Sequence, residues 1–193
     1  MRVTMVRLWV FCSFFIAVSA WSQVRAGSPE SALFDQISAE TSPDAKLELI
    51  GSFEQQFPSS KILSRVYLEA TQVYRNRGVR EKLIEYGEKV LKLDETNITA
   101  MMLLSRNYAI DGKNLDRAIE LGQRAVDRLA SSATDPAPLG YSDAQWKSYV
   151  QTSQNSAQQI LDYAKAIKAR NEAASKVATP SSTTTVAGTP AGK

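Results

Sequence analysis

The chain has 193 residues, of which 44% are hydrophobic and 22% charged, a composition typical of one globular domain with tails. Its 23 Lys and Arg include three arginines ahead of residue 27, where no acid occurs, so the remainder holds 20 positive and 20 negative residues and no net field for nucleic acid. With no histidine and a single cysteine, Cys12, inside that first segment, the chain lacks imidazole bases and internal disulfides. We therefore expect no cofactor, no metal site and no nucleic-acid partner.

Residues 1–26 have the pattern of a secretory signal peptide. Two arginines precede an uncharged apolar run at residues 8–20, which is shorter than the about 20 residues that a membrane-spanning helix needs. Ala20 and Ala26 each end a small-residue cleavage site, so we expect a periplasmic or secreted chain without a stable membrane anchor. A membrane-tethered structural protein that keeps this segment is the alternative.

Residues 27–60 are predicted to form two short helices. Ser28-Pro29-Glu30 and Ser42-Pro43-Asp44 each place a capping serine before a proline and an acid, which is the pattern of a helix start. The second helix is expected to end before Pro58. The segment also carries six acids and one lysine, which we interpret as a soluble face.

Residues 61–131 contain an internal repeat. Identical residues recur at an offset of 34 and, after one inserted residue, at an offset of 35. The matched pairs are Tyr74 and Tyr108, Gly78 and Gly112, Ile84 and Ile119, Glu85 and Glu120, and Gly87 and Gly122. This spacing predicts two copies of one helical unit.

These two copies resemble units of the tetratricopeptide repeat family, a helix–turn–helix patterned W-x2-L-G-x2-Y, A-x3-F and P. The matching residues are Tyr67, Ala70, Thr71, Tyr74, Gly78, Leu83 and Val90 in the first unit, and Met101, Leu104, Ser105, Tyr108, Gly112, Ala118 and Ala125 in the second. Both units depart from the pattern at a glycine, Gly87 or Gly122, where phenylalanine is usual. We expect two helices to come unusually close there.

The resemblance, to an exported bacterial type of the family, implies an all-α fold: a short right-handed helical solenoid in which residues 27–60 form a third, degenerate unit. A loop is expected at residues 132–141. Residues 142–170 have helical spacing with a polar centre, so we interpret them as a capping helix, with a self-association helix as the alternative. The composition of residues 171–193 predicts a disordered tail.

Catalytic motifs are missing from the sequence, which favours a protein without enzymatic activity. Glu81, Glu85 and Glu88 lie at helical spacing beside Lys82 and Lys89, which indicates an ion-paired helix face. An enzyme that uses such carboxylates to process cell-wall or other glycans is the alternative. Convergence of two acids in one pocket would favour it.

The resemblance implies an adaptor or scaffold that binds an unidentified protein or peptide along its concave side. The residues turned toward this groove would be Leu68, Gln72, Arg75 and Asn76 in the first unit, and Met102, Arg106, Ala109 and Ile110 in the second. Arg75 and Arg106 suit a partly acidic, amphipathic ligand. The apolar members can instead pack on a neighbouring helix. Arg75 also belongs to a basic cluster with Arg77, Arg80 and Lys82, which is either a solvated turn or a contact for an acidic partner or anionic lipid.

Overall fold

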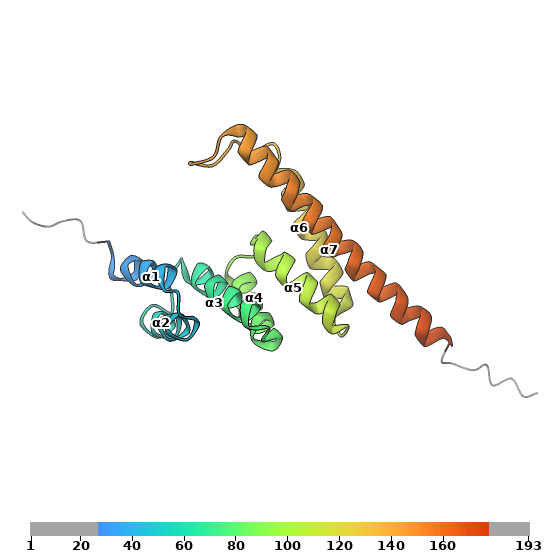
Figure 1. Ribbon diagram of the computed structural model, residues 1–193, viewed down its shortest axis with the longest axis horizontal. Helices are drawn as coiled ribbons and strands as arrows, with labels where there is room; N and C mark the ends of the chain where they lie inside the picture. Colours follow the sequence, from blue (N-terminus) through green and yellow to red (C-terminus); the bar gives the residue numbers. More distant parts are fainter. Residues whose placement is uncertain (1–26, 178–193) are drawn as a thin grey trace, which may run out of the picture.

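The protein is described here by a computed structural model that covers residues 27–177. This part of the chain forms seven α-helices and no strand, so the predicted all-α class is confirmed (Figure 1). The helices are α1 (Pro29–Ala39), α2 (Pro43–Gln56), α3 (Leu63–Arg77), α4 (Arg80–Leu93), α5 (Ile98–Asp111), α6 (Leu115–Ser132) and α7 (Asp143–Val177). The predicted signal peptide and residues 178–193 lie outside the described part. None of the helices just named combines the length and the apolar character needed to cross a bilayer.

Both predicted helix starts near the N-terminus are confirmed. At α1 the Ser28 hydroxyl oxygen accepts a hydrogen bond from the backbone N–H of Ser31, at 3.2 Å, and Pro29 opens the helix. Pro43 opens α2 in the same way, although the Ser42 side chain makes no capping hydrogen bond. As expected, α2 ends before Pro58.

The repeated segment forms two antiparallel helix pairs, α3 with α4 and α5 with α6. Each first helix ends at a glycine in the left-handed region, Gly78 with φ 71° and Gly112 with φ 72°. A side chain would be strained there, so glycine permits the tight turn into the next helix. The turns predicted from the repeat spacing are therefore confirmed.

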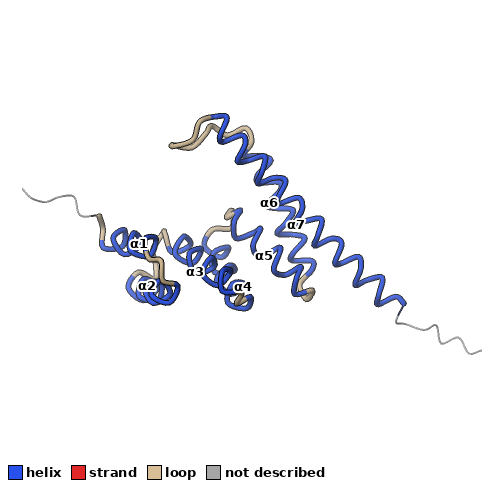
Figure 2. Tube along the Cα trace, in the orientation of Figure 1, coloured by secondary structure: helices blue, strands red, loops and turns tan. Residues whose placement is uncertain are grey.

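The helices pack in chain order. Contacts join each helix to the next, and α7 contacts both α5 and α6. Figure 1 shows α1 and α2 at one end, α3 to α5 in the middle, and α6 and α7 running diagonally side by side at the other end. The longest connection, drawn in tan at the top of Figure 2, joins α6 to α7.

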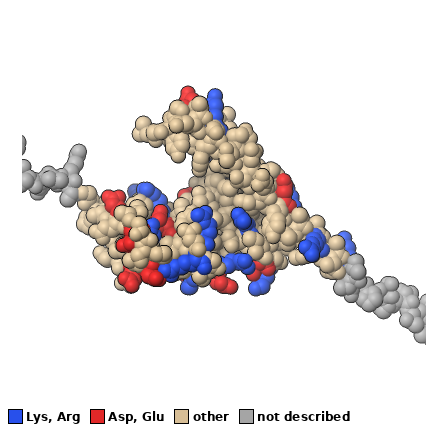
Figure 3. Space-filling model, in the orientation of Figure 1, with Lys and Arg blue, Asp and Glu red and all other residues tan. Residues whose placement is uncertain are grey.

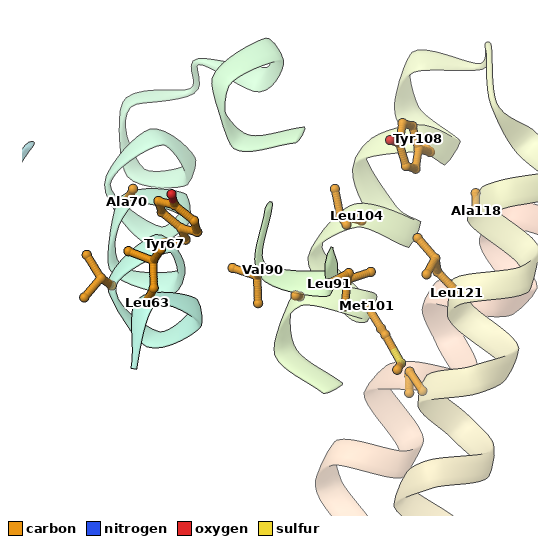
Figure 4. Close-up of a cluster of buried hydrophobic side chains, with 14 of the residues drawn as sticks. Leu63, Tyr67, Ala70, Val90, Leu91, Met101, Leu104, Tyr108, Ala118 and Leu121 are labelled. Atoms are coloured by element: carbon orange, nitrogen blue, oxygen red, sulfur yellow. The ribbon is translucent and has the colours of Figure 1, made fainter. Parts of the chain in front are cut away.

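The core runs along this row of helices, and the repeat positions supply much of it. Figure 4 shows Met101 and Leu104 between the α3 side of the cluster and Ala118 and Leu121 of α6. The small residues predicted to face partner helices are also buried: Ala70, Thr71, Ser105, Ala118 and Ala125. Two of them are polar and are satisfied, because the Thr71 hydroxyl donates to the Tyr67 carbonyl and the Ser105 hydroxyl to the Ala118 carbonyl.

The close helix contacts expected at the two glycines are confirmed. A Cβ on Gly87 would lie 2.9 Å from Leu104 Cδ2. A Cβ on Gly122 would lie 2.9 Å from Ser105 Oγ and 3.3 Å from Leu161 Cα. Glycine on α4 lets α5 approach, and glycine on α6 lets both α5 and α7 approach.

The last helix is longer than predicted, because α7 has 35 residues and continues past residue 170 to Val177. Alanines and charged residues in its final turns favour helix, and Lys168 forms an ion pair with Glu172 one turn later, at 3.8 Å. One stripe of α7 is buried on the side of α5 and α6: Val150, Ala157, Leu161 and Ala164. The loop predicted at residues 132–141 lies at residues 133–142, since α6 ends at Ser132 and α7 begins at Asp143.

Candidate binding site

A pocket of about 320 Å³ opens where the end of α3, the start of α4 and the middle of α5 meet. Its lining residues are Tyr74, Arg75, Gly78, Arg80, Leu83, Leu103, Arg106 and Asn107. We call it the arginine pocket, because three of its lining residues are arginines and two are leucines.

Local structure explains why the three arginines converge. Arg75 lies in the last turn of α3 and Arg80 is the first residue of α4, so the tight turn at Gly78 brings them to the same end of the helix pair. Arg106 comes from α5, which packs against α4. The pocket is thus formed where α3, α4 and the turn between them meet α5.

The three guanidinium groups are exposed, and none forms an ion pair with any acid between residues 27 and 177. Their neighbours in the predicted basic cluster differ. Arg77 donates to Asp44 at 2.7 Å, and Lys82 donates to Glu85 at 2.7 Å. An anion in the pocket would relieve the mutual repulsion of the three arginines, each of which can bind a carboxylate with two parallel hydrogen bonds.

The start of α4 has no side-chain cap. Val79 at the N-cap gives no side-chain hydrogen bond to the first turn, and the acid Glu81 in that turn offsets the partial positive charge of this helix end. Leu83 and Leu103 give the same pocket apolar walls. The arrangement therefore suits a ligand that carries negative charge and apolar surface together.

The eight residues predicted for the groove are not all brought together. Arg75 and Arg106 line the arginine pocket, and the other six do not. Leu68 and Met102 are half-buried against the core. Asn76 and Ile110 are exposed, and Gln72 is half-buried with a buried side-chain oxygen that has no hydrogen-bond partner among the described residues.

One further position was assigned wrongly. Ala109 was expected to face the groove, but it is 1% exposed and belongs to the core, because α5 is covered by α7 as well as by α4 and α6. Arg80, Leu83, Leu103 and Asn107 also line the pocket and were not predicted for the groove. Arg80 was predicted only as a member of the basic cluster. Leu103 and Asn107 line the pocket because α5 packs against α4.

A second pocket of about 320 Å³ bears on the glycan-processing alternative. It is lined by Glu95, Thr96, Met101, Arg124, Asp127, Arg128 and Ser131, so two acids do share a pocket. Both carboxylates are exposed, Asp127 accepts a hydrogen bond from Gln123 at 2.9 Å, and two arginines lie beside them. This open, charge-balanced surface is unlike the buried, apolar surroundings of a general acid in glycosidases.

Other carboxylates join neighbouring helix pairs. Glu54 of α2 accepts hydrogen bonds from the Tyr67 hydroxyl at 2.7 Å and from Lys89 at 3.3 Å. Glu88 of α4 accepts from the Tyr108 hydroxyl at 3.0 Å and from Arg117 at 3.4 Å. Each carboxylate thus links three consecutive helices, which gives these acids a structural role.

These contacts shift the tyrosine pKa values upward. Burial and then the Glu88 carboxylate raise the pKa of Tyr108 to about 12, since both disfavour a phenolate. Burial followed by the hydrogen bond to Glu54 raises the pKa of Tyr67 in the same direction. On the solvent side of α4, the hydrogen bond from Lys82 lowers the pKa of Glu85, which also lies 3.9 Å from Lys89. Of the three acids predicted to form an ion-paired helix face, only Glu85 pairs with Lys82 and Lys89. Glu88 pairs with Arg117 of α6, and Glu81 has no ion pair among the described residues.

Comparison with known proteins gave no match to a family model, to a curated protein or to a solved structure.

Proposed function

We propose that this chain is a binding protein without catalytic activity that holds an acidic, amphipathic segment of a partner protein in the arginine pocket. The observation that carries the proposal is the set of three arginines, Arg75, Arg80 and Arg106, which line one pocket and lack an acidic partner within the described chain. Unpaired arginine beside apolar walls is typical of surfaces that recognise partners.

The helical architecture supports an adaptor role. The two helix pairs share turn glycines, buried small residues and close-contact glycines at repeat spacing, which supports a tetratricopeptide-like helical repeat. Such repeats hold peptides on an extended surface. The N-terminal segment supports export, so the partner would be met in the periplasm or outside the cell.

A defined peptide tests the proposal. The probe is a short fluorescein-labelled peptide of alternating Glu and Leu, and its binding is followed by fluorescence anisotropy. Charge reversal by Arg75→Glu with Arg106→Glu is expected to weaken binding about tenfold or more, because two attractive contacts become repulsive. The same peptide with Lys in place of Glu should not bind the unaltered protein.

Arg170→Glu is the control, since Arg170 is also exposed but lies on α7 and does not line the pocket. It should leave peptide binding unchanged, and circular dichroism should give the same helicity for all variants. Equal loss of binding in the control and the double variant would mean that overall charge, not this pocket, determines binding. Undiminished binding in the double variant would remove the pocket from the proposal.

A further inference from the structure

Three aromatic rings pack together where the α6–α7 connection enters α7, close in the chain to an exposed leucine. The Trp146 ring centroid lies 6.0 Å from that of Tyr141 and 5.5 Å from that of Tyr149, on which it stacks. The two tyrosine centroids lie 6.2 Å apart. Leu139 is fully exposed, and both tyrosines are 50% exposed. We call Leu139, Tyr141, Trp146 and Tyr149 the aromatic tip.

This grouping differs from ordinary surface exposure of apolar residues. Leu93 and Ile110 are also exposed, but they lie on different helices, α4 and α5. Single exposed apolar residues are common on soluble proteins, whereas a contiguous exposed group marks a surface that contacts something else. Because the rings of the aromatic tip already pack on one another, such a contact requires little further ordering of side chains.

The aromatic tip lies at a projecting, uncharged end of the molecule. Figure 1 shows the α6–α7 connection and the first turns of α7 at the top of the view, beyond the end of α5. Figure 3 shows this region mostly in tan, whereas blue and red side chains crowd the lower part of the molecule. Residues 136–142 include no charged residue. The tip can therefore reach an extended surface without bringing the charged helices against it.

The backbone of the tip depends little on water for its hydrogen bonds. Pro136 and Pro138 have no N–H group, and the N–H of Tyr141 donates to the Pro138 carbonyl at 3.1 Å. The N–H of Ser142 donates to the Gln145 side chain at 2.9 Å, and the Ser142 hydroxyl oxygen accepts from the Gln145 N–H at 3.3 Å. Backbone groups that are satisfied within the chain move from water into a less polar layer at lower cost.

These features favour the interface of a lipid bilayer over other partners of an aromatic surface. Trp and Tyr concentrate at bilayer interfaces, because each has an apolar ring and one polar group that can stay hydrated. A sugar needs an open ring face beside polar side chains, but Trp146 and Tyr149 cover one face of each other and Leu139 offers no hydrogen bond. A protein partner would need a hollow shaped for the projecting leucine, whereas a fluid bilayer adapts to it.

We propose that the aromatic tip inserts reversibly into the interfacial layer of a lipid bilayer, with Leu139 as its leading side chain. The inference goes beyond the proposed function, because no residue of the tip lines the arginine pocket. The charged residues beside the tip are Asp135, Asp143 and Lys147, which give no excess of positive charge. Apolar contact therefore drives insertion, and anionic lipid is not required.

A fluorophore at the tip tests insertion. Leu139→Cys in the full chain, with Cys12→Ser, is labelled with nitrobenzoxadiazole, whose emission brightens and shifts to the blue when it leaves water. Vesicles of phosphatidylcholine should produce this shift. Tyr163→Cys in the same Cys12→Ser chain is the matched control, since Tyr163 is also exposed on α7 but lies outside the aromatic tip. Its label should keep its emission in water. Residues 1–26 are otherwise the same in both chains, so they cannot separate the two positions.

The contribution of the tyrosines is measured in the chain labelled at position 139. Tyr141→Ser with Tyr149→Ser should raise the vesicle concentration that gives half of the shift about tenfold or more, because two apolar rings no longer leave water. Tyr163→Ser should leave that concentration unchanged. Tyr141→Phe with Tyr149→Phe keeps both rings and should also keep insertion. Circular dichroism should give the same helicity for all these chains.

The absence of a shift at position 139 with phosphatidylcholine, or an equal shift at positions 139 and 163, would overturn the inference. A shift that needs phosphatidylglycerol in the vesicles and disappears at high salt would also overturn it, because charge and not apolar contact would then hold the tip. These outcomes leave the proposed function untouched, since binding of the Glu–Leu peptide tests the arginine pocket separately.

Discussion

Three glycines inside helices have different surroundings, although each occupies a helix interior. Gly51 in α2 has no atom within 4 Å of the place where a Cβ would be, whereas Gly87 and Gly122 face Leu104 and Ser105. A helical glycine reduces stability by up to about 1 kcal/mol relative to alanine. At Gly51 nothing offsets that loss, while at the other two positions close helix packing does.

Substitution by alanine should therefore have opposite effects at two of these positions. Gly51→Ala is expected to stabilise the protein by up to about 1 kcal/mol through helix propensity. Gly122→Ala should destabilise it by about 1–3 kcal/mol, because the new methyl meets Ser105 Oγ at 2.9 Å and the Leu161 backbone at 3.3 Å. Urea unfolding followed by circular dichroism measures both. Equal effects at the two sites would contradict the close approach of α5 and α7 to α6.

At the scale of helices, the sequence predicted the features that depend on residues close together in the chain. Helix starts at Pro29 and Pro43, turns at Gly78 and Gly112, and buried small positions all follow from capping chemistry and helical periodicity. The composition of residues 171–177 gave a wrong end for α7. Alanine is common in disordered tails, but it also has the highest helix propensity and so can continue a helix that has already formed.

The candidate site was predictable only in part. Arg75 and Arg106 lie on the same predicted face of successive first helices, one turn apart in the repeat, so their exposure followed from helical geometry. Which arginines remain unpaired depends on contacts between helices: Asp44 of α2 engages Arg77 and leaves Arg75 without an acid. Ala109 was misplaced for a similar reason, since its burial depends on the helices that pack around α5 and not on the spacing within α5.

The tyrosine contacts between helices predict instability at high pH. Tyr108 has a pKa of about 12 in the folded protein and about 10 when unfolded, so the folded state holds its proton more tightly. The resulting stability is present below pH 10 and is lost as pH rises from 10 to 12. Tyr67 acts in the same direction. The urea midpoint of the wild type should fall across this range.

The control is a chain with Tyr67→Phe and Tyr108→Phe, which has no hydroxyl at either position to titrate. Its midpoint should be lower than that of the wild type at pH 8, because Glu54 and Glu88 each lose a donor. Between pH 10 and 12 it should decline less than the wild type. Parallel curves for the two proteins would show that these hydroxyls titrate normally.

Over the whole molecule, burial increases from the first helix pair toward the middle. α1 contributes one buried residue, Ile37, and α2 contributes two, Ile50 and Phe53, whereas α5 contributes six. α1 packs mainly on α2 and α3, while α5 contacts α4, α6 and α7. In a row of helices that pack on their neighbours, an end with few buried residues opens before the middle.

Hydrogen exchange should therefore be faster in α1 and α2 than in α5 and α6 under native conditions, as measured by mass spectrometry of peptic peptides. Phe53→Ala removes the largest buried side chain of the first pair and should release α1 and α2 while α5 and α6 keep their protection. Leu121→Ala removes a fully buried side chain of α6, a helix that contacts both α5 and α7, and should raise exchange across α5 to α7. The two variants differ in this way only if α1 and α2 unfold separately from the other helices. In a single cooperative transition every helix would exchange at the same rate in both variants. Uniform exchange from α1 to α7 would show that the first pair, despite its small core, unfolds only with the rest of the molecule.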